Sequence, residues 1–79
     1  MMTSIRVHAT WDPEASVWVA ESDDVPGLVT EASSVEALTD KLRGLIPELL
    51  EANGVAWPAD DEIPFDVVAE RRDRVRMAS

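Results

Sequence analysis

The chain has 79 residues, a formal net charge of −9 and no cysteine. This length allows one domain, and a domain of this size buries only about 60% of the surface that its unfolded chain exposes. Without cysteine the chain can form neither a disulfide nor a thiolate metal site, so its stability must come from packing or from a second subunit. We therefore predict a single domain over residues 1–79, and the small core favours self-association.

The charge is distributed unevenly along the chain. Residues 1–70 carry three basic residues against fifteen acidic ones, a net charge of −12, whereas residues 71–79 carry four arginines against one aspartate, a net charge of +3. An acidic body repels nucleic acid and anionic lipid and attracts a basic partner. For most of the acids we favour the alternative that they only keep a small protein soluble.

No segment resembles a targeting or membrane-spanning sequence. The residues from Met1 to His8 lack the apolar run of a signal peptide. The most apolar stretch, Leu45 to Leu50, is far shorter than the ~20 residues that a membrane-spanning helix needs. We expect a cytoplasmic protein that does not enter the membrane.

Two β-forming segments predict a hairpin near the start of the chain. Ser4 to Trp11 alternates apolar and polar residues, the pattern of a half-buried strand. Ser16 to Ser22 is rich in residues that favour strands. Asp12-Pro13 between them suits the first two positions of a type I turn.

A second turn and a short third strand follow the hairpin. Pro26-Gly27 favours a type II turn, in which the glycine takes a positive φ. Leu28 to Ala32 then predicts a strand. The turn should align this strand with the second one.

The next segment predicts one amphipathic helix. Ser33 lies three residues before Glu36, which matches a capping box, and Asn53-Gly54 is a helix stop signal. Pro47 conflicts with a straight helix, so we expect a kink near it or two short helices that share one apolar face. That face carries a stripe of aliphatic residues: Val35, Leu38, Leu42, Leu45 and Leu49, with Ile46 and Leu50 beside them.

A fourth strand is predicted from Phe65 towards Val75, after a polar connection from Val55 to Pro64 whose acids, Asp60, Asp61 and Glu62, should be solvated. The element order is therefore β-β-β-α-β. A right-handed helical crossover makes the fourth strand parallel to the first. The helix covers one face of the sheet, which gives an α+β domain of two layers.

The second strand supplies the candidate surface for a partner. Trp18 points to one face and Val17 and Val19 to the other, and one helix covers only one face. Either Trp18 or the valine pair therefore lies on the open face; a lone exposed hydrophobe is the ordinary alternative. Acids follow directly, so we predict an apolar centre with an acidic rim, made by Val17, Trp18, Val19, Glu21, Asp23 and Asp24.

Residues for catalysis are scarce. His8, the only histidine, is on the polar side of the first strand, without a nucleophile motif nearby. The three glycines form no phosphate-binding loop. Glu21, Asp23 and Asp24 lack the spacing of a calcium loop. We expect neither an enzyme nor a metal or cofactor site.

The order of these pieces resembles the HicB-like antitoxin family, and in particular its short stand-alone members. The likeness covers roughly the first fifty residues and rests on four runs: Trp11-Asp12, Val17 to Ser22, Asp24 to Leu28, and Thr30 to Ala32 before the helix. The resemblance implies a truncated ribonuclease H-like fold with sheet order 3-2-1-4. This agrees with the β-β-β-α-β order predicted from the residues.

The resemblance also implies a non-enzymatic module that assembles with itself and, in HicB proper, masks a small basic toxin ribonuclease. The first strand, Ile5 to Trp11, contains no acid, so the metal-dependent nuclease activity of ribonuclease H does not carry over. The likeness does not extend to the DNA-binding domain of HicB proteins, so nucleic-acid binding is not expected. The alternative function is that of a stand-alone domain that binds a small ligand or an ion.

Overall fold

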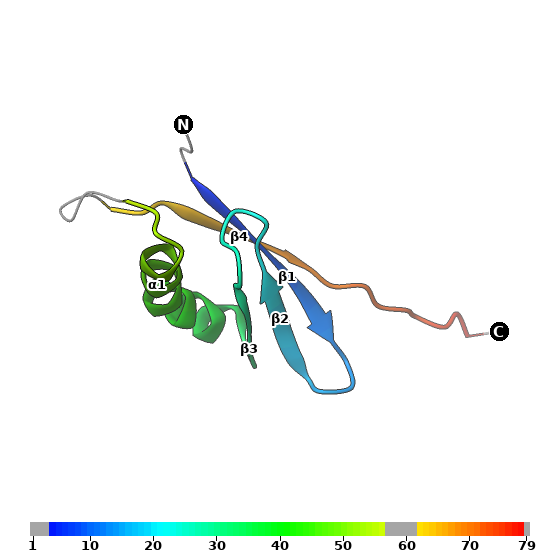
Figure 1. Cartoon of the computed structure of the whole chain (residues 1–79). Coiled ribbons are helices and arrows are strands. Elements are labelled where there is room, and N and C mark those ends of the chain that lie inside the picture. Colours follow the sequence, from blue (N-terminus) through cyan, green and yellow to red (C-terminus); the bar gives the residue numbers. More distant parts are fainter. Residues whose placement is uncertain (1–3, 57–61, 79) are drawn as a thin grey trace.

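The structure is a computed structural model that describes residues 4–56 and 62–78. Its elements are β1 (Ile5–Asp12), β2 (Val17–Glu21), β3 (Val29–Ala32), α1 (Val35–Ala52) and β4 (Phe65–Glu70), as Figure 1 shows. The predicted order β-β-β-α-β is confirmed. The prediction of solvated acids at Asp60 and Asp61 lies outside the described residues.

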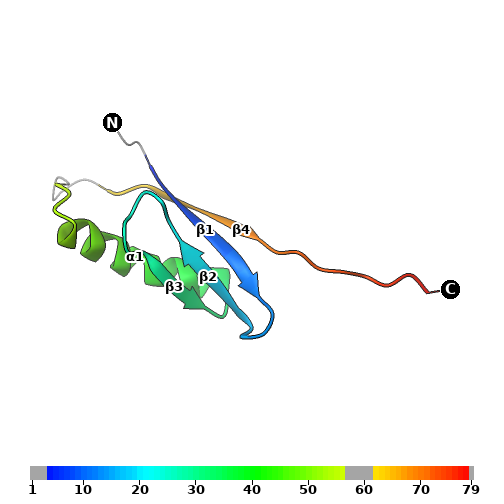
Figure 2. The same cartoon turned by 45° about the vertical axis from the view of Figure 1, so that its right-hand side comes forward.

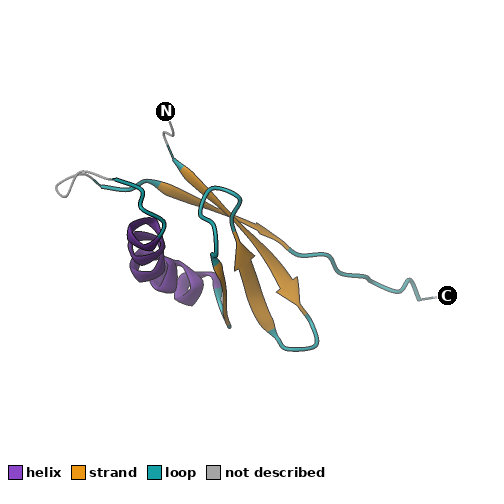
Figure 3. Cartoon of the chain, in the orientation of Figure 1, coloured by secondary structure: helices purple, strands orange, loops and turns teal. Residues whose placement is uncertain are grey.

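The four strands form one mixed sheet with the order β3-β2-β1-β4. β1 pairs antiparallel with β2, β2 pairs antiparallel with β3, and β4 lies parallel to β1. α1 packs on one face of this sheet, mainly over β2 and β3, and leaves the other face open (Figures 2 and 3). The predicted α+β domain of two layers, with sheet order 3-2-1-4, is therefore confirmed.

The core lies between α1 and the alternate residues of β1. Ile5, Val7 and Ala9 have no exposed surface, and the polar residues between them are exposed. The helix contributes its buried residues at four-residue spacing: Leu38, Leu42, Ile46 and Leu50. Leu45 and Leu49, which the sequence placed in the central stripe, are only half-buried at its margin. The whole apolar face of the helix was correctly predicted, but its centre passes through Ile46 and Leu50.

Both predicted turns are present. Asp12 Oδ1 accepts hydrogen bonds from the backbone N–H groups of Glu14 and Ala15, so the aspartate holds the β1–β2 turn through its side chain. In the second turn, the N–H of Leu28 donates to the carbonyl oxygen of Val25, and Gly27 has a φ of +86°. A positive φ after proline is the geometry of a type II turn.

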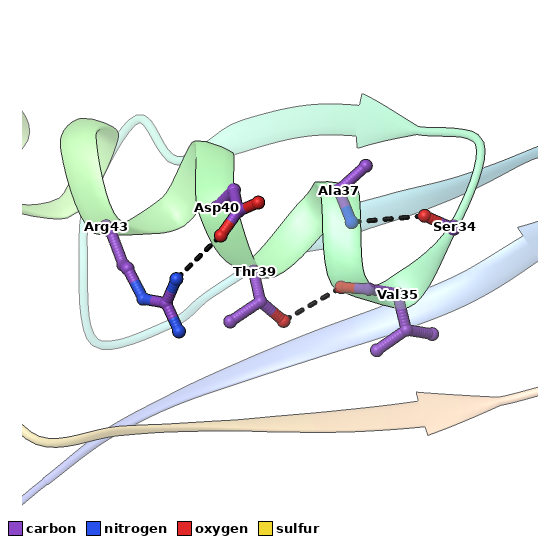
Figure 4. A network of polar contacts seen from close by, with 6 residues as sticks. All are labelled: Ser34, Val35, Ala37, Thr39, Asp40 and Arg43. Atoms are coloured by element: carbon purple, nitrogen blue, oxygen red, sulfur yellow. Dashed lines mark hydrogen bonds and ion pairs between the residues drawn. The ribbon is translucent and has the colours of Figure 1, made fainter.

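The helix begins one residue later than predicted. Ser34, not Ser33, is the N-cap, and its Oγ accepts a hydrogen bond from the N–H of Ala37 (Figure 4). The capping box of Ser33 with Glu36 is therefore wrong. In a capping box, the side chain three residues after the cap accepts a hydrogen bond from the backbone N–H of the cap residue. That position is Ala37 here, so the backbone N–H of Ser34 has no such acceptor. The sequence pattern favours Ser33, because Glu36 follows it at the spacing of a capping box, but in the fold it is Ser34 that caps the helix.

Replacing Ser34 by alanine should lower the free energy of unfolding by about 1 kcal/mol, because the N–H of Ala37 loses its acceptor. Ser33→Ala is the matched control, since Ser33 is exposed and does not cap the helix. Urea denaturation followed by circular dichroism measures both. Equal losses in the two variants would contradict the cap assignment.

The C-terminus of α1 has the predicted glycine stop. The N–H of Gly54 donates to the carbonyl of Glu51 and the N–H of Val55 donates to that of Leu50, which is a Schellman motif. Gly54 has a φ of +74°, as the motif requires. The amide of Asn53 also donates to the carbonyl of Pro26, so the helix end is tied to the second turn.

The helix runs unbroken through Pro47, so the alternative of two short helices is wrong. Proline has no N–H for the carbonyl four residues back, here that of Arg43. Pro47 and Arg43 are both exposed, so water can solvate that carbonyl. The buried residues on the opposite side keep the helix continuous.

The fourth strand ends at Glu70, five residues earlier than the predicted end at Val75. Beyond it, residues 71–78 are exposed, without regular secondary structure, and extend away from the body of the molecule (Figure 1). The radius of gyration, 15.3 Å, exceeds the roughly 12 Å of a compact chain of this length. We call residues 71–78 the C-terminal arm.

Candidate functional site

The candidate surface is the sheet face that α1 does not cover. Val17 and Val19 of β2 lie on this face, because Trp18 and Ala20 alternate with them and pack towards the helix side. The alternative left open by the sequence is thus decided in favour of the valine pair. We call this surface the open face; its centre is Val19, which lies between Thr10 of β1 and Glu31 of β3.

Trp18 belongs to the helix side of the sheet, beside the hydrophobic core. Its ring meets that of Trp11 edge to face, with 5.4 Å between the centroids and 64° between the planes. The guanidinium of Arg71 lies 4.4 Å from the centroid of Trp11. Trp18 therefore shares no face with Val17, Val19 or Glu21, and it forms an aromatic cluster at the end of the sheet instead.

Acidic side chains surround the valines of the open face. The strand register places Val29, Glu21, His8 and Val68 in one row across the sheet and Glu31, Val19, Thr10 and Glu70 in the next. Val29 is 70% exposed and Val68 is 39% exposed, so apolar surface continues towards both edges. Asp12, opposite Val17, adds a carboxylate at the end. The predicted acidic rim is therefore wider than β2, because β1, β3 and β4 also contribute to it.

Asp24, one of the predicted rim residues, has a local structural contact. Its Oδ2 accepts a hydrogen bond of 2.8 Å from the backbone N–H of Arg6. Ser22 Oγ donates to the carbonyl of Arg6 and accepts from the N–H of Asp24. The side chains of Ser22 and Asp24 thus supply hydrogen-bond partners for the N–H and the carbonyl of Arg6, a residue of β1 that lies beyond the end of β2. Sequence reasoning missed Ser22 entirely, although a Ser-x-Asp run at a strand end is a known local hydrogen-bonding pattern.

Asp23 is exposed in the same turn, next to the end of β2. The structure therefore separates the three predicted acids: Glu21 lies on the open face, Asp23 lies at its end, and the carboxylate of Asp24 is held against β1. Only Glu21 lies between valines of that face in the strand register.

Few polar side chains in the described part of the chain lie close enough together to form a catalytic or metal-binding site. Within residues 4–56 and 62–78, no three histidine or acidic side chains form a group that could hold a metal ion. His8 lies on the open face with its Nε2 3.9 Å from Oε1 of Glu70, and both side chains are about half exposed. None of the buried residues described is polar or charged.

Two hollows of the described surface are lined by none of the open-face valines, although one of them includes Thr10, the neighbour of Val19. One, of about 390 Å³, is lined by Trp11 and residues around the end of β4: Thr10, Pro13, Glu70 and Arg72. Another, of about 310 Å³, lies between α1 and the residues before β4: Leu42, Arg43, Ile46, Pro47, Glu62, Ile63 and Phe65. Neither is lined by a buried polar side chain that would orient a small ligand.

Among the described residues, no helix has the length and apolar character that crossing a membrane requires.

Comparison with known proteins identifies the family of this chain. Among solved structures, the crystal structure of the hypothetical protein TTHA1013 of Thermus thermophilus, an extremely thermophilic bacterium, is similar. It has 50% sequence identity and a TM-score of 0.69, over 94% of this chain and 99% of that chain. No curated protein matches. The family model described as a domain of unknown function, DUF1902, matches residues 4–79. Because this match runs from the first strand through the C-terminal arm, the chain belongs to the DUF1902 family.

Proposed function

We propose that this chain is a protein-interaction domain, without catalytic activity, that binds a small basic protein on its open face in the manner of the HicB antitoxins. The observation that carries the proposal is the arrangement of Val19 and its neighbouring valines among the carboxylates of Glu21, Glu31 and Glu70 on an uncovered sheet face. Apolar groups at the centre of an interface supply binding energy, and charges at its rim mainly speed association.

The charge of the body supports a basic partner. Residues 1–70 carry a net charge of −12. The open face concentrates five acids against Arg6, His8 and Arg72, whose guanidinium lies 3.5 Å from the carboxylate of Glu70: Asp12, Glu21, Glu31, Asp66 and Glu70. A basic protein would be drawn to this face, whereas nucleic acid would be repelled. The likeness to HicB adds that the basic protein is a toxin ribonuclease and that the two meet in the cytoplasm.

A protein partner fits this surface better than the alternative of a small ligand. Small ligands bind in concave sites with a few converging polar groups. The valines lie instead on an extended strand surface, and neither of the two hollows is lined by one of them. Val29 and Val68 carry exposed apolar surface to opposite edges of the sheet, so the face extends across all four strands.

The test uses the tagged full chain to capture proteins from a lysate of its natural host, with identification by intact mass. The association rate of the captured partner is then measured for Glu21→Lys with Glu31→Lys. We expect at least a tenfold lower rate for this variant, because two rim charges are reversed. The rate of the unaltered protein should also fall between low salt and about 0.5 M salt, where screening is nearly complete.

Glu48→Lys with Glu51→Lys is the matched control. It changes the net charge by the same amount, but both residues are exposed on α1, on the far side of the domain from the open face. Its association rate should fall much less. An acidic partner, or equal effects of the two charge reversals, would show that the proposed surface is wrong.

A further inference from the structure

β4 forms one edge of the sheet. It is the last strand in the order β3-β2-β1-β4 and pairs only with β1 among the described residues. At the opposite edge, Lys41 of α1 donates through Nζ to the carbonyl of Glu31 on β3, so that carbonyl already has a side-chain donor. The described structure shows no comparable side chain on the outer edge of β4, so this edge is available for another strand.

The C-terminal arm continues the line of β4 past the end of the domain. Arg71 keeps the alternation of the strand, because its guanidinium lies over Trp11 on the helix side of the sheet. The arm then projects into solvent, with Val75 88% exposed and Met77 85% exposed (Figures 1 and 2). Covering these two side chains with apolar surface would remove them from water, which is favourable.

The arm and β4 have complementary compositions. β4 carries the acids Asp66 and Glu70 on the open face and the apolar Phe65 and Val67 on the helix side. Continuing the same alternation, the arm carries Arg72, Arg74 and Arg76 in the open-face positions and Val75 and Met77 in the helix-side positions.

We propose that residues 65–78 pair antiparallel with the same segment of a second copy of this chain, with the two Arg71 residues opposite each other at the two-fold axis. The arm of each copy then lies along the outer edge of the partner's β4. The two four-stranded sheets then become one continuous sheet, and β4 of each copy is no longer an open edge. A two-fold axis requires such self-complementary contacts.

The register follows from the side chains. With the two-fold axis at Arg71, Arg72 of one copy lies opposite Glu70 of the other, and Arg76 lies opposite Asp66, all on the open face. On the helix side they put Val75 opposite Val67, and Met77 opposite Phe65. Opposite charges and apolar pairs directly across two strands each stabilise a sheet, by roughly 0.2–1 kcal/mol, and the two-fold axis makes each of these pairs twice. The single pair of Arg71 with Arg71 brings like charges together and is unfavourable.

Neighbouring registers fit less well. A shift of one residue in the pairing would place the apolar residues of the arm beside the charged residues of β4, since successive side chains point to opposite faces. An axis at Glu70 would keep only the pairs of Arg74 with Asp66 and of Val75 with Phe65, and it would set Asp73 against Val67 and Arg72 against Val68. An axis at Arg72 would form the pairs of Arg74 with Glu70, Asp73 with Arg71 and Met77 with Val67. It would leave Asp66 opposite Ala78 and Arg76 opposite Val68, so fewer of the side chains of β4 have a complementary partner.

Cysteine scanning tests the register directly, because the chain contains no cysteine of its own. Directly opposite residues have Cα atoms about 4.5–5.5 Å apart, within the range of a disulfide. Arg71→Cys should therefore form a covalent dimer on mild oxidation. Ala69→Cys and Asp73→Cys are the matched controls, since each would lie more than about 13 Å from its own copy. The double variant Ala69→Cys with Asp73→Cys should cross-link again.

A second variant tests the pairing without cross-links. Val75→Pro leaves the single chain undisturbed, because Val75 is exposed on the arm, but proline cannot take part fully in a strand ladder. By light scattering, the unaltered protein should have the mass of a dimer at ~100 μM, and Val75→Pro should weaken dimerisation at least about tenfold. Arg76→Glu should act in the same direction, whereas Arg43→Glu, on the exposed side of α1, should not.

The proposal is overturned by a single-chain mass of the unaltered protein at that concentration, by equal cross-linking at positions 69, 71 and 73, or by a dimer that survives Val75→Pro. A dimer that survives this variant but is lost in Glu21→Lys with Glu31→Lys would place the interface on the open face instead. The basic protein can still bind Val19, Glu21 and Glu31, which the arm of the second copy does not reach, so each proposal can fail without the other.

Discussion

Leu42→Ala should lower the free energy of unfolding by about 2–5 kcal/mol. Leu42 has no exposed surface and lies midway along the buried side of α1, between Leu38 and Ile46. The variant loses the transfer free energy of the removed methyl groups and leaves a cavity that the rigid sheet beneath cannot fill. A domain of this length has a total stability of about 4–12 kcal/mol, so the loss is a large part of the whole.

Leu45→Ala is the matched control, because it removes the same atoms from a half-buried position at the margin of the core. Its loss should be clearly smaller than that of Leu42→Ala, since water already reaches the site. Urea unfolding monitored by tryptophan fluorescence measures both, at one fixed protein concentration because self-association shifts apparent stability. If the two variants lost equal stability, the helix would be rotated relative to the sheet from the orientation described.

Gly27→Val should destabilise the fold by about 1–3 kcal/mol. Gly27 has a φ of +86° in the turn between β2 and β3, and a β-branched residue strongly disfavours that conformation. A Cβ at this position would lie 3.8 Å from Leu49 Cδ2, an ordinary contact, so most of the cost comes from the backbone. The turn also fixes the buried residues Val25 and Leu28 and the contact of Asn53 with Pro26, so strain there reaches the core.

Two variants separate backbone strain from other effects of replacing glycine. Gly27→Asn should cost less than Gly27→Val, because asparagine tolerates a positive φ better than other side chains. Gly44→Ala should raise the stability by about 0.5–1 kcal/mol, because Gly44 is inside α1 and a Cβ there meets no atom within 4 Å. Thermal unfolding by circular dichroism ranks the three variants. A Gly27→Val protein as stable as the parent would mean that the turn does not require a positive φ.

Local patterns in the sequence determined the elements and their order. Alternation in Ile5, Val7 and Ala9 marks a strand with one buried face, because successive side chains of a strand point to opposite sides. Pro26-Gly27 and Asn53-Gly54 mark their turn and helix end through backbone conformations that few other residues adopt. The rule that crossovers are right-handed then makes the fourth strand parallel to the first. The resemblance to HicB implied the full sheet order 3-2-1-4, which the structure has.

Only the tertiary structure decided which face of the sheet the helix covers. Trp18 and the valines beside it alternate in the same way whichever side is buried, so periodicity cannot choose between them. The position of α1 over β2 and β3 makes the choice and leaves Val17 and Val19 on the open face. The cap was also decided by the fold: the capping-box spacing favours Ser33, but it is Ser34 that caps the helix.

Contacts between distant residues were also beyond the sequence. The carboxylate of Asp24 accepts a hydrogen bond from the backbone N–H of Arg6, eighteen positions earlier, because β1 is longer than β2 and leaves backbone groups without a strand partner; the sequence pattern gives no sign of this contact. The fourth strand was predicted to reach Val75, yet it ends at Glu70, near the end of the β1 strand with which it pairs. Strand propensity is a property of a segment, whereas a strand exists only where a neighbouring strand supplies its hydrogen bonds.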